Sequence, residues 1–178
     1  MAAESLNDPF ALFGLPASFD VDAAALERTY LARSRAAHPD FHAADDAAQE
    51  QAVEESSRLN EAYTILKTPI LRAEHLLDRL GGPSGLEVRD MPPEFLMEIM
   101  DLREEIEDVR QAGGLETDRG RALEAKLNAD LQGVYAEMGE KFATALAAEK
   151  ADADLLLGIR RSINVARYLE GLLRDLKE

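Results

Sequence analysis

Apolar residues recur along most of the chain at spacings of three and four, the period of an α-helix, and no segment alternates as a half-buried strand does. Ala, Leu, Glu and Arg, which are strong helix formers, dominate the sequence. The pattern predicts an all-α fold of seven helices. We expect them at residues 9–13, from after a cap at Asp20 or Asp22 to about 37, and at about 45–67, 69–80, 93–112, 117–149 and 152–177.

The helical pattern is interrupted most clearly between residues 81 and 90. This segment holds three glycines and Pro83 without hydrophobic periodicity, which is typical of a linker. We therefore predict two domains, residues 1–80 and residues 91–178, joined by a linker at 81–90.

The second and third helices are expected to form an antiparallel hairpin, because a short loop joins them. In the second helix Leu26 and Tyr30 form the inner face, whereas Arg28 and Arg35 lie on the opposite face. The third helix carries one narrow seam that should face the second, formed by Ala52, Ser56, Leu59, Tyr63 and Leu66.

The last three helices should form a small bundle, again because their connections are short. The middle helix has a sustained core seam of Leu123, Leu127, Leu131, Val134, Met138, Phe142 and Leu146. Gly133 and Gly139 interrupt this helix, and each costs about 1 kcal/mol relative to Ala. We expect a bend or a close helix approach at these glycines.

The first helix of the bundle has apolar residues on two sides. One side is enough to bury the helix and consists of Phe95, Ile99, Leu102, Ile106 and Val109. The other side carries Leu96, Met97 and Met100, followed by the carboxylates of Asp101, Glu104 and Asp108. Met adapts to partner surfaces, and exposed apolar patches tend to mark binding sites. The alternative is that Leu96 and Met100 pack against the linker or the N-terminal domain.

Composition narrows the possible functions. The 178 residues include no cysteine, which excludes disulfides, thiolate catalysis and cysteine-ligated metal sites. There is no phosphate-binding Gly-rich loop and no Gly-x-Ser-x-Gly motif, so we expect neither an enzyme nor a cofactor. No apolar run approaches the roughly 18 residues of a transmembrane helix, and the first residues lack the features of a secretory signal. We therefore expect a cytoplasmic protein.

Charge is abundant and unevenly placed. The net charge of −15 argues against nucleic acid or an anionic membrane as a partner. Arg28, Arg33 and Arg35 nevertheless lie close together in the second helix. Because Arg28 and Arg35 face away from the core, they are candidates for docking to an acidic surface. The alternative is an ordinary solvated helix face.

The second helix ends at His38-Pro39-Asp40. Pro39 disfavours helix for the residue before it, so the tripeptide should lie at a loop, accessible to a partner. In isolation the tripeptide is better explained as a His at a helix C-terminus, stabilised by the helix dipole, followed by an ordinary Pro-Asp turn. Between two long helices, however, the tripeptide resembles that of the J-domain, which stimulates the ATPase of DnaK-type chaperones. A metal site including His42 is not favoured, because the spacing matches no standard ligand pattern.

Both halves together resemble the HscB family, the J-domain co-chaperones of iron–sulfur cluster assembly. The resemblance rests on three segments: Pro9-Phe10-Ala11-Leu12-Phe13-Gly14-Leu15-Pro16, Thr68-Pro69-Ile70-Leu71-Arg72-Ala73-Glu74-His75-Leu76-Leu77 and Phe95-Leu96-Met97-Glu98. It implies an N-terminal J-domain and a C-terminal three-helix domain.

The resemblance also implies two partners. A specialised DnaK-type ATPase of the HscA type would bind His38, Pro39 and Asp40, and its acidic surface would face Arg28 and Arg35. A scaffold protein of the IscU type would bind the C-terminal domain through Leu96, Met97, Met100, Asp101, Glu104, Asp108 and Tyr168.

The sequence departs from the family pattern in places. Arg33 stands where Leu is usual, Ala37 where an aromatic residue is usual, and Phe41 where J-domains often have Lys. The cysteine pairs of some eukaryotic relatives are absent, which fits a bacterial-type form. Two alternatives stay open: a J-protein that serves a different client, and a helical regulator bound to DNA or a membrane, which the negative charge disfavours.

Overall fold

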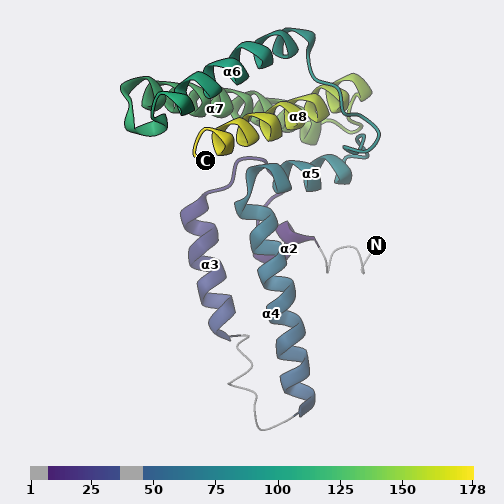
Figure 1. Ribbon diagram of the computed structural model, residues 1–178. Helices are drawn as coiled ribbons and strands as arrows, with labels where there is room; N and C mark the ends of the chain where they lie inside the picture. The colour runs from purple at the N-terminus through teal and green to yellow at the C-terminus, as the bar shows by residue number, and fades with distance from the viewer. Residues whose placement is uncertain (1–7, 37–45) are drawn as a thin grey trace. The chain divides into compact units, whose positions relative to one another are not determined.

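The computed structural model describes residues 8–36 and 46–178 (Figure 1). Within these ranges the chain forms seven α-helices, one short 3₁₀ helix and no strand, and each helix begins and ends within two residues of its predicted position. The chain divides into two compact units, Met1–Leu76 and Leu77–Glu178, and the division falls inside helix α5 (Pro69–Arg79).

The N-terminal unit contains α2 (Pro9–Phe13), α3 (Ala23–Ala36) and α4 (Asp46–Lys67). Asp8 caps α2 by accepting a hydrogen bond from the Phe10 amide at 3.1 Å, and its Oδ1 lies 3.4 Å from His75 Nε2 on α5. Helix α2 ends at Gly14, whose φ of 66° is left-handed and favours glycine. Of the two aspartates considered as a cap for α3, Asp22 accepts from the Ala25 amide at 3.0 Å.

Helices α3 and α4 lie side by side as a hairpin (Figure 1). In the predicted seam of α4, Ala52, Leu59 and Leu66 are buried, whereas Ser56 and Tyr63 are half-buried. Tyr30 of α3 stacks on Tyr63 with ring centroids 4.0 Å apart. The Tyr30 hydroxyl donates to Asn60 Oδ1 at 2.8 Å, so this aromatic pair also carries a polar link between the two helices.

Arg33, which stands where the family resemblance leads us to expect leucine, makes a polar contact instead of packing in the core. The side chain is exposed, and its Nη1 donates to the main-chain carbonyl of Leu12 at the end of α2. The last carbonyls of a helix have no partner within the helix, so this hydrogen bond ties α3 to α2 while the charge stays in water.

The C-terminal unit contains α6 (Pro93–Gln111), the 3₁₀ helix η2 (Gly114–Glu116), α7 (Asp118–Ala147) and α8 (Ala153–Asp175). In the predicted seam of α7, Leu123, Leu127, Leu131, Met138 and Phe142 are buried, while Val134 and Leu146 are half-buried. Helix α8 contributes the largest share of buried side chains, including Ile159, Ile163, Ala166 and Leu169. The three helices thus enclose one apolar core, as the periodicity predicted.

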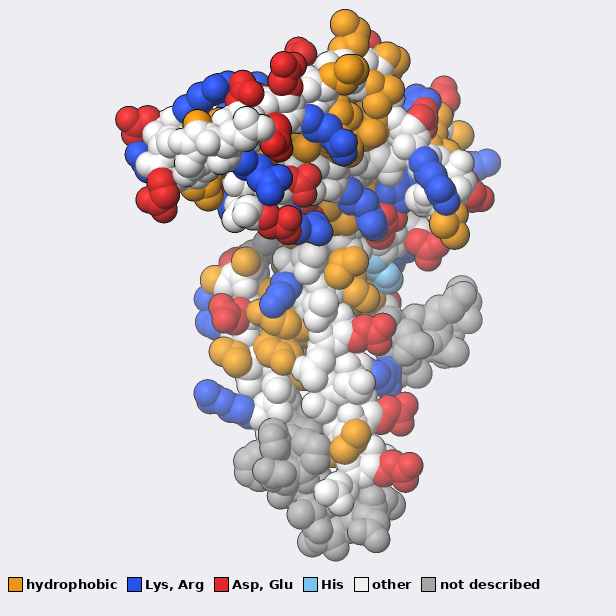
Figure 2. Space-filling model, viewed as in Figure 1, with side chains coloured by type: hydrophobic (Ala, Val, Ile, Leu, Met, Phe, Trp, Pro, Cys, Tyr) orange, Lys and Arg blue, Asp and Glu red, His pale blue; other side chains and the backbone are white. Residues whose placement is uncertain are grey.

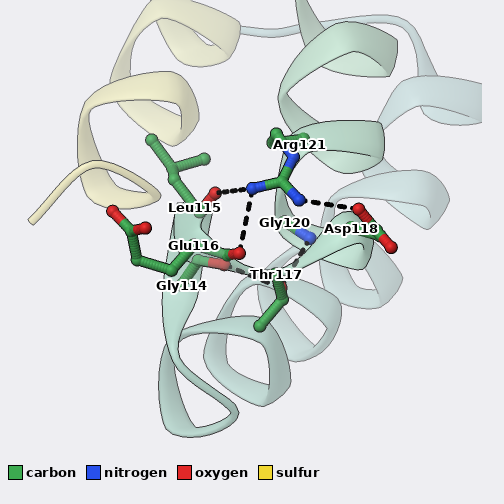
Figure 3. Close-up of polar contacts among 7 residues, drawn as sticks. All are labelled: Gly114, Leu115, Glu116, Thr117, Asp118, Gly120 and Arg121. Atoms are coloured by element: carbon green, nitrogen blue, oxygen red, sulfur yellow. Dashed lines mark hydrogen bonds and ion pairs between the residues drawn. The ribbon is translucent and has the colours of Figure 1, made fainter.

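The turn between α6 and α7 is closed by polar contacts (Figure 3). Thr117 Oγ1 donates to the Gly114 carbonyl at 2.8 Å and accepts from the Gly120 amide at 3.0 Å. Arg121 Nη1 donates to the carbonyls of Leu115 and Glu116 at 3.1 and 2.9 Å. A Cβ added at Gly120 would lie 2.1 Å from the Gly114 carbonyl oxygen, so only glycine permits this approach.

Another segment therefore approaches α7 closely at Gly120. At Gly133, where the sequence suggested it, a Cβ would meet nothing within 4 Å. Of the bend or close approach expected at Gly133 and Gly139, the close approach is therefore absent at Gly133, because no other element that the structure describes passes over that face of the helix. Gly139 is buried.

Candidate functional site

The tripeptide His38-Pro39-Asp40 lies outside the described residues, so its place in the J-domain hypothesis stays a prediction. The outer face of α3, which precedes it, is described. Arg28 and Arg35 are both exposed there, on the side opposite the buried Leu26. Leu31 lies between them along the helix and is 48% exposed. The face is thus basic with an apolar centre.

The second candidate surface is at the start of α6. Leu96, Met97 and Met100, the α6 patch, are 47%, 77% and 76% exposed. In Figure 2 hydrophobic side chains gather at the top of the view, over the end where α6 begins. On the opposite side of α6, Leu102, Ile106 and Val109 are buried, while Phe95 and Ile99 are half-buried. The helix therefore has a core side and a separate exposed apolar side, as predicted.

Tyr168 of α8 lies at the edge of the core near the start of α6. Its ring meets Phe95 edge to face, with centroids 6.0 Å apart and an interplanar angle of 90°. Its hydroxyl accepts a hydrogen bond from Arg103 Nε at 2.5 Å, and the Arg103 guanidinium carbon lies 5.4 Å from the ring centroid. These contacts fix the half-buried aromatic side chain on the α6 side of α8.

The three predicted carboxylates of α6 are all exposed but differ in their neighbours. Asp108 lies 3.6 Å from Arg119 Nη2 on α7, and Glu105 lies 3.9 Å from Arg119 Nε. Asp101 and Glu104, which lie closer to the α6 patch, have exposed side chains. A partner that covered the patch would meet negative charge along one side of it.

Arg103 is the residue of this surface that the sequence analysis missed. It lies three residues after Met100 and seven after Leu96, so helical spacing places it on the same strip of α6. The spacing that marks it was present in the sequence, but Arg103 was not among the predicted site residues.

Within the described ranges the molecule offers no cluster of His, Asp and Glu that could hold a metal ion. Over the same residues, no helix has the length and apolar character needed to cross a membrane. What the described residues offer instead is contact surface: a basic helix face in one unit and an apolar patch beside carboxylates in the other. Those are features of a protein that works by binding other proteins.

Comparison with known proteins identifies the class more closely. The family model of the HSCB C-terminal oligomerisation domain matches residues 91–177. A co-chaperone protein HscB homolog from Bordetella petrii is 40% identical over 142 residues, which are 79% of each chain. One from Bordetella avium is 37% identical over 160 residues, covering 84% of this chain and 95% of the relative. The chain belongs to the HscB co-chaperone family.

Solved structures agree. The chaperone HscB from Vibrio cholerae superposes with a TM-score of 0.76 at 28% identity, covering 96% of this chain and 95% of that one. The human co-chaperone HscB gives a TM-score of 0.77 at 24% identity, covering 96% and 80%, and shows the same fold. The predicted family and the predicted all-α fold are both confirmed.

Proposed function

We propose that this protein links an iron–sulfur scaffold protein of the IscU type to a specialised DnaK-type ATPase of the HscA type, and that it stimulates ATP hydrolysis by that ATPase. It has no catalytic step of its own in this scheme. The N-terminal unit binds the ATPase, the C-terminal unit binds the scaffold, and the single chain brings both together. The cytoplasm, where such partners are expected in a bacterium, is where we expect it to work.

The observation that carries the proposal is the exposure of the α6 patch. Three large apolar side chains are exposed although the opposite side of the same helix already packs into the core. Burying such an exposed apolar patch against a partner would stabilise the complex, because apolar surface is then removed from water. The flexible thioethers of Met97 and Met100 can adapt to the partner, while Asp101 and Glu104 at the border favour a basic partner rim.

The role of the N-terminal unit rests on membership of the HscB family and on the residues around the tripeptide. His38, Pro39 and Asp40 would contact the ATPase directly. Arg28 and Arg35, exposed on α3, would face an acidic surface of the ATPase and speed the encounter. Such steering is screened by salt, since the Debye length is only about 8 Å at physiological ionic strength.

The proposal is tested with the full-length protein, a purified IscU-type scaffold and an HscA-type ATPase. We expect stimulated ATP hydrolysis on addition of this protein, further stimulation when the scaffold is added, and a measurable heat of binding between the protein and the scaffold. Absence of any stimulation would contradict the co-chaperone role as a whole. Stimulation without scaffold binding would show that the protein serves a different client.

A further inference from the structure

The segment before α6, which lies in the predicted linker, contains a turn closed by hydrogen bonds. Ser84 donates to Glu87 Oε2 through its amide at 2.7 Å and its hydroxyl at 2.8 Å. These hydrogen bonds lower the pKa of the Glu87 carboxyl, the amide bond having the larger effect. The amides of Glu87 and Val88 both donate to the Ser84 carbonyl, at 3.2 and 3.1 Å. We call residues 84–90 the strap.

The strap is fastened to α8 by two side chains. Asn164 Nδ2 donates to the main-chain carbonyls of Val88 at 3.2 Å and Asp90 at 2.9 Å. Arg161 donates to Asp90 Oδ2 through Nε at 3.0 Å and through Nη2 at 2.6 Å. An exposed ion pair contributes little stability by itself. Most of the stabilisation of the strap therefore comes from Asn164, which donates hydrogen bonds to two backbone carbonyls.

Helix α6 has no side-chain cap of its own. Its N-cap is Pro92, which makes no capping hydrogen bond, and Pro93 begins the helix without an amide. The α6 patch nevertheless lies within the first two turns, where an uncapped helix frays most readily. Contacts from other parts of the unit can therefore stabilise the first turns of α6.

One stripe of α8 supplies that support. Arg161, Asn164 and Tyr168 follow one another at spacings of three and four, so they share a face of the helix. Arg161 and Asn164 hold the strap just before Pro92, and Tyr168 contacts Phe95 and accepts from Arg103. This face of α8 therefore contacts the chain at two places: at the strap, immediately before the α6 patch, and at Phe95 and Arg103, beside the patch.

We propose that Arg161 and Asn164 are positioning residues: through the strap they fix the first two turns of α6 and so present the α6 patch to the scaffold protein. This inference rests on the proposed function for the identity of the partner. The physical basis is pre-organisation: a partner binds more weakly when only a fraction of the molecules adopt the binding conformation.

The test compares the Arg161→Ala/Asn164→Ala double variant of the full chain with Arg174→Ala, which removes an exposed arginine from the last turn of the same helix. Amide hydrogen exchange in residues 84–97 should become roughly tenfold faster in the double variant, because two hydrogen bonds and an ion pair are lost. Exchange in α7 should stay unchanged. If about a third of the molecules keep the binding conformation, scaffold affinity should fall about threefold.

A swapped pair, Asp90→Arg/Arg161→Asp, should retain slower exchange than Arg161→Ala, since it keeps an ion pair at the same place. Unchanged exchange at residues 84–97, exchange that rises equally in α7, or faster local exchange with unaltered scaffold affinity would each overturn the proposal. The exchange measurement needs no partner. It decides the role of the strap even if the scaffold fails to bind the unmodified protein, a result that would count against the proposed function instead.

Discussion

Helix α3 has 14 residues and buries one side chain, Leu26, whereas α8 has 23 residues and buries ten. The hairpin of α3 and α4 is held by a narrow seam and a stacked tyrosine pair, and most of its surface faces solvent. The bundle of α6, α7 and α8 encloses a broad core and leaves one apolar patch outside it. The difference teaches how each region can be altered: under the proposed function the hairpin would act through exposed charged and loop residues, whereas the bundle would act through a patch that its core holds in place.

Asp40→Asn should have the largest effect. The change replaces one oxygen by nitrogen in a predicted loop, and it should abolish stimulation of the ATPase while the free energy of unfolding stays within about 1 kcal/mol of the unmodified value. Asp20→Asn, at an exposed position of the same unit, is the control and should stimulate normally. Normal stimulation by Asp40→Asn in a steady-state assay would show that the J-domain hypothesis is wrong.

Gly120→Ala should be the most damaging single change in the bundle. Its Cβ would lie 2.1 Å from the Gly114 carbonyl oxygen, so the turn in Figure 3 must move. We expect a loss of about 1–3 kcal/mol in the free energy of unfolding, measured by denaturant titration.

Gly133→Ala is the matched control, because its Cβ meets nothing within 4 Å. It should stabilise the same helix by up to about 1 kcal/mol through helix propensity. Equal effects of the two substitutions would contradict the close approach at Gly120.

Replacing Leu96, Met97 and Met100 together by Ala should weaken scaffold binding at least tenfold, which corresponds to about 1.4 kcal/mol. The three side chains are exposed, so thermal unfolding and basal stimulation of the ATPase should be preserved. Val53→Ala, an exposed apolar truncation in the hairpin, should leave the scaffold affinity unchanged. Titration calorimetry decides: an unaltered dissociation constant in the folded triple variant would exclude the α6 patch as the binding surface.

The smallest effect is expected from Arg28→Glu/Arg35→Glu. The double variant should associate more slowly with the ATPase, by a few-fold at low salt, and its association rate should depend less on ionic strength. Arg110→Glu/Arg174→Glu in the bundle changes the net charge equally and should leave the salt dependence as it is. Association rates are measured by stopped flow over a salt series. If the dependence of the rate on ionic strength is the same for both variants, Arg28 and Arg35 belong to an ordinary solvated helix face.

The sequence by itself determined the helices and the family. Periodic burial such as that of Leu102, Ile106 and Val109 follows from local spacing, and the exposure of the α6 patch follows from the same spacing read on the opposite side. Helix ends at Pro9 and Gly14 were equally readable, because proline and glycine restrict or permit backbone angles locally.

Only the tertiary structure decided which residues meet across the chain. Asn164 donates hydrogen bonds to the carbonyls of Val88 and Asp90, which lie more than seventy positions away in the sequence. Arg103 donates to the hydroxyl of Tyr168, sixty-five positions away. Another segment approaches Gly120 closely, whereas no described segment comes within 4 Å of a Cβ added at Gly133. Side-chain periodicity reports the face of a helix but not the element that lies against it, since that depends on how the whole chain packs.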